Sequence, residues 1–158
     1  MFLFQYPASL ERCADGEVIV RFPDLRGTIT GGANEAEALA EAADLLGSAI
    51  AHSIAEKEPI PPPSALKRGQ RLVPVPFWIA GKLAIYQAIQ EAGITNVELA
   101  RRLGVTEAVV RRILDPGHET KDRKLSAALA APSKEIVMAV VPRKAALRFQ
   151  KLAKASPR

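Results

Sequence analysis

Several residue types that define whole classes of protein are scarce in this sequence of 158 residues. Cys13 is the only cysteine, so an internal disulfide is excluded and a metal site cannot be built from thiolates. The two histidines, His52 and His118, are far apart and lack other metal ligands at the usual spacing. Residues 1–20 lack the pattern of a signal peptide, and no apolar run is long enough to cross a bilayer. We therefore expect a cytoplasmic protein that needs neither metal nor cofactor and has no membrane partner.

Aromatic residues are also rare, at 5% of the chain, and Trp78 is the only tryptophan. Apolar residues nevertheless make up 48% of the sequence, which is enough for real hydrophobic cores. Because so few aromatics are present, those cores must consist mainly of Leu, Ile, Val and Ala. The length allows one domain of ordinary size or two small ones.

Negative charge is scarce in the second half of the chain. Residues 1–77 contain seven Lys or Arg and ten Asp or Glu, a net charge of −3. Residues 78–158 contain fifteen and seven, a net charge of +8. This asymmetry suggests two tasks, with an acidic half that faces a basic partner and a basic half that faces a polyanion. An uneven but purely solvated surface would give the same counts, so charge alone does not decide.

The first half has the pattern of a small antiparallel sheet covered by one helix. Strand formers and turn residues predict strands over residues 2–7, 18–22, 27–30 and 71–75. Between the third and fourth strands, apolar residues recur every three or four positions over residues 34–57, with Asn34 as the N-cap of a helix. Residues 59–64 contain four prolines and form an extended connector. The predicted order is therefore βββαβ.

The second half is predicted to be helical, which makes the whole chain an α+β protein. The expected helices cover residues 82–92, 95–103, 106–114 and 122–131. Gly93 ends the first of them and Pro132 ends the last. Residues 136–141 have the pattern of a strand, and residues 143–158 form a basic tail.

The strongest local signal is a helix-turn-helix over residues 96–115. This motif needs a small residue where its helices touch and a turn residue that tolerates positive φ, and Ala100 and Gly104 meet these needs. Thr95 and Thr106 occupy the N-cap positions. The side expected to be buried carries Leu99, Leu103, Val105, Val110 and Ile113. A generic helical hairpin would explain this apolar pattern as well.

The charges favour DNA binding over a generic hairpin, because Arg101, Arg102, Arg111 and Arg112 all occupy outward positions. The second helix of the pair should enter the major groove, where arginine can read guanine and glutamate can accept from cytosine. The expected DNA contacts are Asn96, Thr106, Glu107, Ala108, Arg111, Arg112, Lys121 and Arg123. For Arg111 and Arg112, contact with phosphate instead of bases is an equal alternative.

A sequence motif in the first half adds a family resemblance. The run Phe22-Pro23-Asp24-Leu25-Arg26-Gly27 is followed by residues 28–32, which end in two glycines, and by a helix that opens with Glu35-Ala36. Together with Tyr6-Pro7, these features resemble the HicB family of antitoxins over roughly residues 2–75. Within the motif, Pro23 and Gly27 are expected to shape a turn, and Asp24 to bond the backbone there.

The resemblance implies a partial ribonuclease-H-like fold that binds a small toxin of the HicA type. Such toxins are basic nucleases that cleave mRNA, and the complex of toxin and antitoxin represses its own promoter. A helix-turn-helix is one of the two DNA-binding endings that the family uses. The acidic first half agrees with a basic partner, since complementary charge steers association.

These observations predict three regions and three kinds of partner. Residues 1–76 should form a toxin-binding domain, residues 77–142 a helix-turn-helix domain for DNA binding and dimerisation, and residues 143–158 a basic tail. The expected partners are a HicA-type toxin, double-stranded operator DNA, and further copies of this chain in a homodimer or tetramer.

Two other functions are alternatives to that of an antitoxin. A ribonuclease-H-like nuclease needs several carboxylates around two metal ions, yet residues 1–7 contain no acid and Asp24 belongs to a turn. We therefore expect no enzymatic activity and no catalytic residues. The second alternative is a stand-alone repressor whose first domain senses a small ligand, and the sequence alone does not separate it from an antitoxin.

Overall fold

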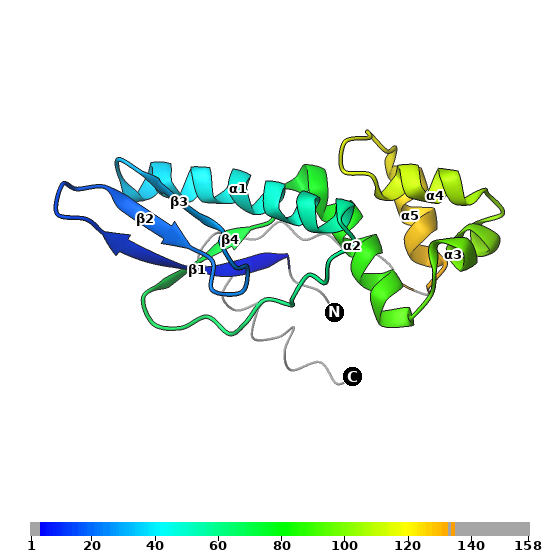
Figure 1. Cartoon of the computed structure of the whole chain (residues 1–158), viewed down its shortest axis with the longest axis horizontal. Helices are drawn as coiled ribbons and strands as arrows, with labels where there is room; N and C mark the ends of the chain where they lie inside the picture. Colours follow the sequence, from blue (N-terminus) through cyan, green and yellow to red (C-terminus); the bar gives the residue numbers. More distant parts are fainter. Residues whose placement is uncertain (1–3, 133, 135–158) are drawn as a thin grey trace.

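The computed structural model describes residues 4–132 and residue 134 of the chain. A sheet backed by one long helix forms one end of the molecule, and shorter helices form the other end (Figure 1). The elements are β1 (Gln5–Arg12), β2 (Val18–Arg21), β3 (Ile29–Gly32), α1 (Glu35–Ala55), β4 (Gln70–Pro74), α2 (Phe77–Ala92), α3 (Asn96–Leu103), α4 (Glu107–Leu114) and α5 (Asp122–Ala130). This order confirms the predicted α+β class and the βββαβ first half. The predicted strand over residues 136–141 and the basic tail lie outside the described residues.

The sheet has the order β3-β2-β1-β4, and all its described pairs are antiparallel. The sequence predicted that the first strand would end at Pro7, but β1 continues to Arg12. Residues Gln5–Ala8 pair only with β4 in the described register, and pairing with β2 begins at Ser9. Because the strand is paired on one side only at Pro7, the missing N–H of the proline does not interrupt a second ladder.

Helix α1 covers one face of the sheet and supplies five buried residues of the first core. The Asn34 side chain accepts hydrogen bonds from the backbone N–H groups of Ala36 and Glu37, which confirms the predicted cap. Buried residues then recur at every fourth position, namely Ala38, Ala42, Leu46, Ile50 and Ile54. They pack against buried strand residues, which include Tyr6, Val18, Val20 and Val73. At Gly32 on β3, a Cβ atom would lie 2.6 Å from the backbone nitrogen of Ala38, so only glycine permits this close approach.

Three hydrogen bonds hold residues 58–64, which include the proline-rich connector, against the rest of the chain. The Tyr6 hydroxyl donates to the carbonyl of Pro61 (2.8 Å), and the Tyr86 hydroxyl donates to the carbonyl of Glu58 (2.8 Å). Asp24 accepts from the backbone N–H of Ser64 at 2.9 Å, rather than from a neighbour in its own turn. Burial and the nearby Asp24 raise the pKa of Tyr6 to about 12. The motif residues Tyr6 and Asp24 therefore fix the connector in place.

Helix α2 joins the two ends of the molecule. It begins at Phe77, five residues earlier than predicted, and passes through Gly81 without a break. A Cβ atom at Gly81 would lie 3.0 Å from Cδ1 of Leu125, so the glycine lets α5 pack closely against α2. One side of α2 completes the first core with Ile79, Leu83 and Tyr86. Another side forms the second core with Ala84, Ile85, Ala88 and Ile89. Because α2 contributes to both cores, the domain boundary at residue 76 stays a prediction.

Candidate nucleic-acid interface

Helices α3 and α4 meet at the predicted corner. Ala100 is buried there, and Gly104 ends α3 with a φ of 64° in the left-handed region. The backbone N–H of Val105 donates to the carbonyl of Ala100 at 3.0 Å, which closes the turn. The Thr95 hydroxyl caps α3 by accepting from the N–H of Glu98, whereas Thr106 occupies the N-cap position of α4 without a side-chain cap bond. The structure thus confirms the helix-turn-helix.

The apolar side of the motif packs on α2 and α5. Leu99, Val110 and Ile113 are buried as predicted and share the second core with Ala128 and Leu129 of α5. Leu103 is partly buried against this core. Val105 was also predicted to be buried, but 39% of it is exposed. It lies in the turn after Gly104 and outside both helices, so the helical period that suggested burial does not apply to it.

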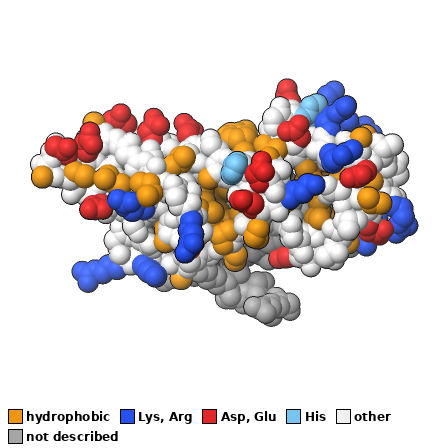
Figure 2. Space-filling view, viewed as in Figure 1, with side chains coloured by type: hydrophobic (Ala, Val, Ile, Leu, Met, Phe, Trp, Pro, Cys, Tyr) orange, Lys and Arg blue, Asp and Glu red, His pale blue; other side chains and the backbone are white. Residues whose placement is uncertain are grey.

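The structure brings most of the predicted DNA contacts to the surface. Thr106, Glu107 and Ala108 lie exposed at the start of α4, and Arg111 and Arg112 lie exposed one turn later. The remaining predicted contacts are Lys121 and Arg123, exposed at the start of α5, and Asn96, half-buried at the start of α3. Lys and Arg side chains gather over this end of the molecule, alongside a few carboxylates (Figure 2). The predicted roles of these residues stay predictions.

Three of the four arginines on α3 and α4 are partnered by glutamates on their own helix. Arg101 donates to both carboxylate oxygens of Glu98, at 2.8 and 2.9 Å, and Arg102 donates to the same group at 2.7 Å. Arg111 lies 3.9 Å from Glu107. One carboxylate cannot neutralise two guanidinium groups, and exposed ion pairs contribute little free energy. These arginines can therefore exchange their glutamate for a phosphate or a base.

Comparison with known proteins agrees with both halves of this structure. Residues 5–84 match the model of the HicB-like antitoxins of bacterial toxin–antitoxin systems, which is about half of the chain. The chain belongs to the HicB antitoxin family. Residues 82–116 match a model described as winged helix-turn-helix DNA-binding, and this match contains α3 and α4. Membership of a family of antitoxins agrees with the expectation that the protein is not an enzyme.

Two relatives show how far the similarity extends. Antitoxin HicB 1 of Photorhabdus laumondii is 38% identical over 117 residues, which cover 74% of this chain and 74% of that protein. Antitoxin HicB of Escherichia coli K12 is 32% identical over 137 residues, which cover 87% of this chain and 99% of that protein. The similarity to HicB antitoxins therefore includes both the sheet domain and the helical region.

The ion pairs of Glu98 make the stability of this HicB-family protein depend on acidic pH. Hydrogen bonds from Arg101 and Arg102 lower the pKa of Glu98 from its usual 4.5 to about 2. A lowered pKa means that the contribution of Glu98 is complete above pH 4.5 and is lost as the pH falls toward 2. We expect the melting temperature of wild type to exceed that of Glu98→Gln at neutral pH, and the difference to shrink through this range.

Thermal melts of both proteins at several pH values measure this difference. Glu41→Gln serves as a control, because Glu41 is an exposed carboxylate on α1 for which no ion pair is described. A difference between wild type and Glu98→Gln that stays constant down to about pH 2 would contradict the assignment.

A buried lysine fixes the segment between α4 and α5. Lys82 of α2 is only 4% exposed, and its ammonium group donates to the carbonyl oxygens of Ile113 (3.0 Å), Asp115 (2.6 Å) and His118 (2.8 Å). The Thr120 hydroxyl lies 3.2 Å from the same nitrogen. The cation thus satisfies carbonyls at the C-terminal end of α4, where the helix dipole is negative. Burial lowers the pKa of Lys82, and Asp115 opposes this shift.

Sequence reasoning did not identify Lys82 as a structural residue. Its signal was a single charge within residues 77–86, whose other members are glycine and apolar or aromatic residues, so that a solvated lysine would be out of place. The partners could not be read from the sequence, because backbone carbonyls carry no residue-specific pattern.

The described residues contain no alternative centre of metal chemistry. Across residues 4–132 and 134, no three His, Cys, Asp or Glu side chains are grouped so that they could hold a metal ion. Within the same part of the chain, no helix combines the length and apolar character needed to cross a membrane.

Proposed function

We propose that this protein neutralises a HicA-type, mRNA-cleaving toxin through residues 1–76 and represses its own operon through residues 77–142. The observation that carries the proposal is the union, in one chain, of a HicB-like sheet domain with a helix-turn-helix. The second helix of that motif exposes Arg111 and Arg112. One protein would then both inhibit the toxin and repress transcription of the operon that encodes it.

The charge of the first half supports a basic partner. Glu37, Glu41 and Asp44 are exposed on α1 at spacings of four and three residues, so they lie on one side of the helix. In Figure 2, acidic side chains follow the edge of the molecule over α1. Negative charge on this domain would speed its encounter with a basic toxin and disfavour acidic competitors.

The DNA-binding half supports a symmetric assembly. Helix-turn-helix proteins commonly read two half-sites as dimers, because one recognition helix contacts too few bases to select an operator. We propose a homodimer or a tetramer with contacts from the second half, including residues 136–141, which lie outside the described part. Repression of an operon also requires the protein to act where the DNA is, in the cytoplasm.

Co-expression tests the proposal and separates it from a stand-alone repressor. A candidate toxin, chosen as a small basic protein encoded next to this gene, is induced in cells with or without this protein. We expect the protein to restore growth and to copurify with the toxin. Toxicity that persists, with no copurification, would overturn the antitoxin role and favour the ligand-sensing repressor.

A matched variant separates the two activities. The double substitution Arg111→Ala and Arg112→Ala changes only exposed residues of α4. It should still protect cells from the toxin, while repression of a reporter behind the native promoter is lost.

A further inference from the structure

We propose that a pocket between α4 and α5 holds one backbone phosphate of the bound DNA duplex, gripped by Arg112 from α4 and Lys124 from α5. This inference rests on the proposed DNA binding and deepens it. The pocket has a volume of about 190 Å³ and is lined by Val109, Arg112, Ile113, His118, Glu119, Thr120, Lys121 and Lys124. A water molecule occupies about 30 Å³ in the liquid, so a phosphate group fits with room for solvent.

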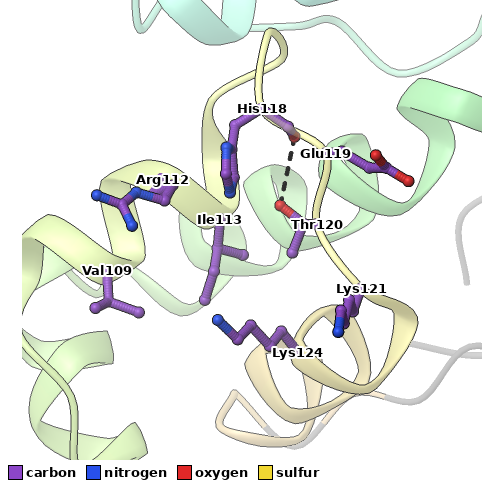
Figure 3. A pocket seen from close by; sticks show the side chains of 8 residues that line it. All are labelled: Val109, Arg112, Ile113, His118, Glu119, Thr120, Lys121 and Lys124. Carbon is purple, nitrogen blue, oxygen red and sulfur yellow. Dashed lines mark hydrogen bonds between the residues drawn. The ribbon is translucent and has the colours of Figure 1, made fainter.

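The charges around the pocket fit an anion. Arg112, Lys121 and Lys124 are basic residues, whereas Glu119 is the only carboxylate among the lining residues that the structure describes. Figure 3 shows the Lys124 side chain extending toward Ile113, while the Glu119 carboxylate points away from it. The pocket therefore presents a net positive charge over an apolar floor of Val109 and Ile113.

Arg112 and Lys124 differ from the other arginines of α3 and α4 in their ion pairing. Arg101, Arg102 and Arg111 each lie within 4.0 Å of a glutamate, at 2.8, 2.7 and 3.9 Å. Arg112 and Lys124 form no ion pair with any carboxylate whose side chain the structure describes. A cation without an internal partner loses no ion pair when it binds a phosphate, so charge-assisted bonds to the anion are a net gain.

The wall of the pocket is held in place before DNA arrives. His118 and Thr120 belong to the segment that Lys82 fixes through the His118 carbonyl (2.8 Å) and the Thr120 hydroxyl (3.2 Å). Lys121 follows directly as the N-cap residue of α5. Because this segment is already ordered, binding of a phosphate need not include the entropy cost of folding a loop.

The position of the pocket assigns different roles to two neighbouring arginines. Arg112 lines the pocket, whereas Arg111 lies outside it and beside Glu107 on α4. Phosphate contacts set the register of a protein on DNA, and base contacts supply the sequence preference. Arg112 is therefore the phosphate contact, and Arg111 remains the candidate for reading a base.

The salt dependence of DNA binding tests whether Arg112 and Lys124 share one phosphate. The affinity of the full-length chain for a random-sequence duplex is measured between roughly 50 and 200 mM salt, where each phosphate contact contributes about 0.9 to the log–log slope. The test variant combines Arg112→Gln with Lys124→Gln. The charge-matched control combines Arg26→Gln with Lys67→Gln, two exposed residues of the first half for which no side-chain bond is described.

We expect the slope of the test variant to fall by about 0.9, the value for a single phosphate, with no change in the control. A fall near 1.8 would mean two separate phosphates, and no fall would mean none, so either result overturns the shared site. Circular dichroism checks that each variant is folded. If the variant with Arg112→Gln and Lys124→Gln unfolds, the variant with Arg112→Ala and Lys124→Ala replaces it. Wild type that fails to bind any duplex would overturn the proposed DNA binding itself.

Discussion

Replacing Lys82 by methionine is expected to lower the free energy of unfolding by roughly 2–4 kcal/mol, because a buried carbonyl left without a donor costs about 1–3 kcal/mol. Methionine preserves the length and the apolar stem of the side chain but removes the donors to Ile113, Asp115 and His118. The favourable interaction of a cation with the C-terminal end of α4 is lost at the same time. Removal of a desolvated charge offsets part of this loss, and so the expected value lies below the sum of the bonds.

Urea unfolding followed by circular dichroism measures the change. Lys67→Met is the matched control, because it makes the same substitution at an exposed position in the first half. The control should change stability by less than about 0.5 kcal/mol. If both variants have the same midpoint and slope, the ammonium group does not hold the α4–α5 segment, and the pocket beside it is not preformed.

Arg111→Ala is expected to weaken binding to the native operator by roughly 5- to 150-fold, the range that corresponds to the 1–3 kcal/mol of a bidentate base contact. Arg111 is exposed on α4, and its 3.9 Å separation from Glu107 leaves it free to reorient toward a base. A non-operator duplex presents the wrong base at that position, so its affinity should fall much less.

Fluorescence anisotropy with the two duplexes measures both affinities at one salt concentration. Arg21→Ala is the matched control, because Arg21 of β2 is also exposed and lies 3.8 Å from Glu11 in a similar ion pair. It should leave both affinities unchanged. Equal weakening of operator and non-operator binding by Arg111→Ala would show a phosphate contact instead of base reading.

Features with local causes could be predicted from the sequence. The cap at Asn34, the turn glycine at position 104 and the amphipathic helix α1 all appear in the structure where they were expected. Each depends on residues within a few positions of one another, because a cap or a helix face involves only adjacent turns. For the same reason the helix-turn-helix and its exposed arginines were correctly located.

Features with distant causes were missed or misplaced. The start of α2 was predicted too late because Gly81 disfavours a helix locally, and only the contact with Leu125 shows why glycine is needed there. The composition of the connector predicts only an extended linker, and the hydrogen bonds from Tyr6, Asp24 and Tyr86 follow from the folded chain. The first strand was predicted to end at Pro7 because a proline interrupts a strand that is paired on both sides. Only the folded sheet shows that β1 is paired on one side at this residue.

The order of strands and helices and the helix-turn-helix could thus be predicted from short-range periodicity and turn chemistry, and the resemblance to HicB antitoxins from the motif at residues 22–36. The tertiary structure alone decided which cations are available to a ligand. Arg101 and Arg112 are both exposed arginines, but one is bonded to Glu98 and the other lines a pocket. Lys82 and Lys124 are both lysines, but Lys82 is buried and bonded to backbone carbonyls, whereas Lys124 is exposed and lines the pocket. Whether a charged side chain can bind a ligand or instead stabilises the fold depends on the residues around it in space. Packing between elements that are distant in the chain determines which residues these are.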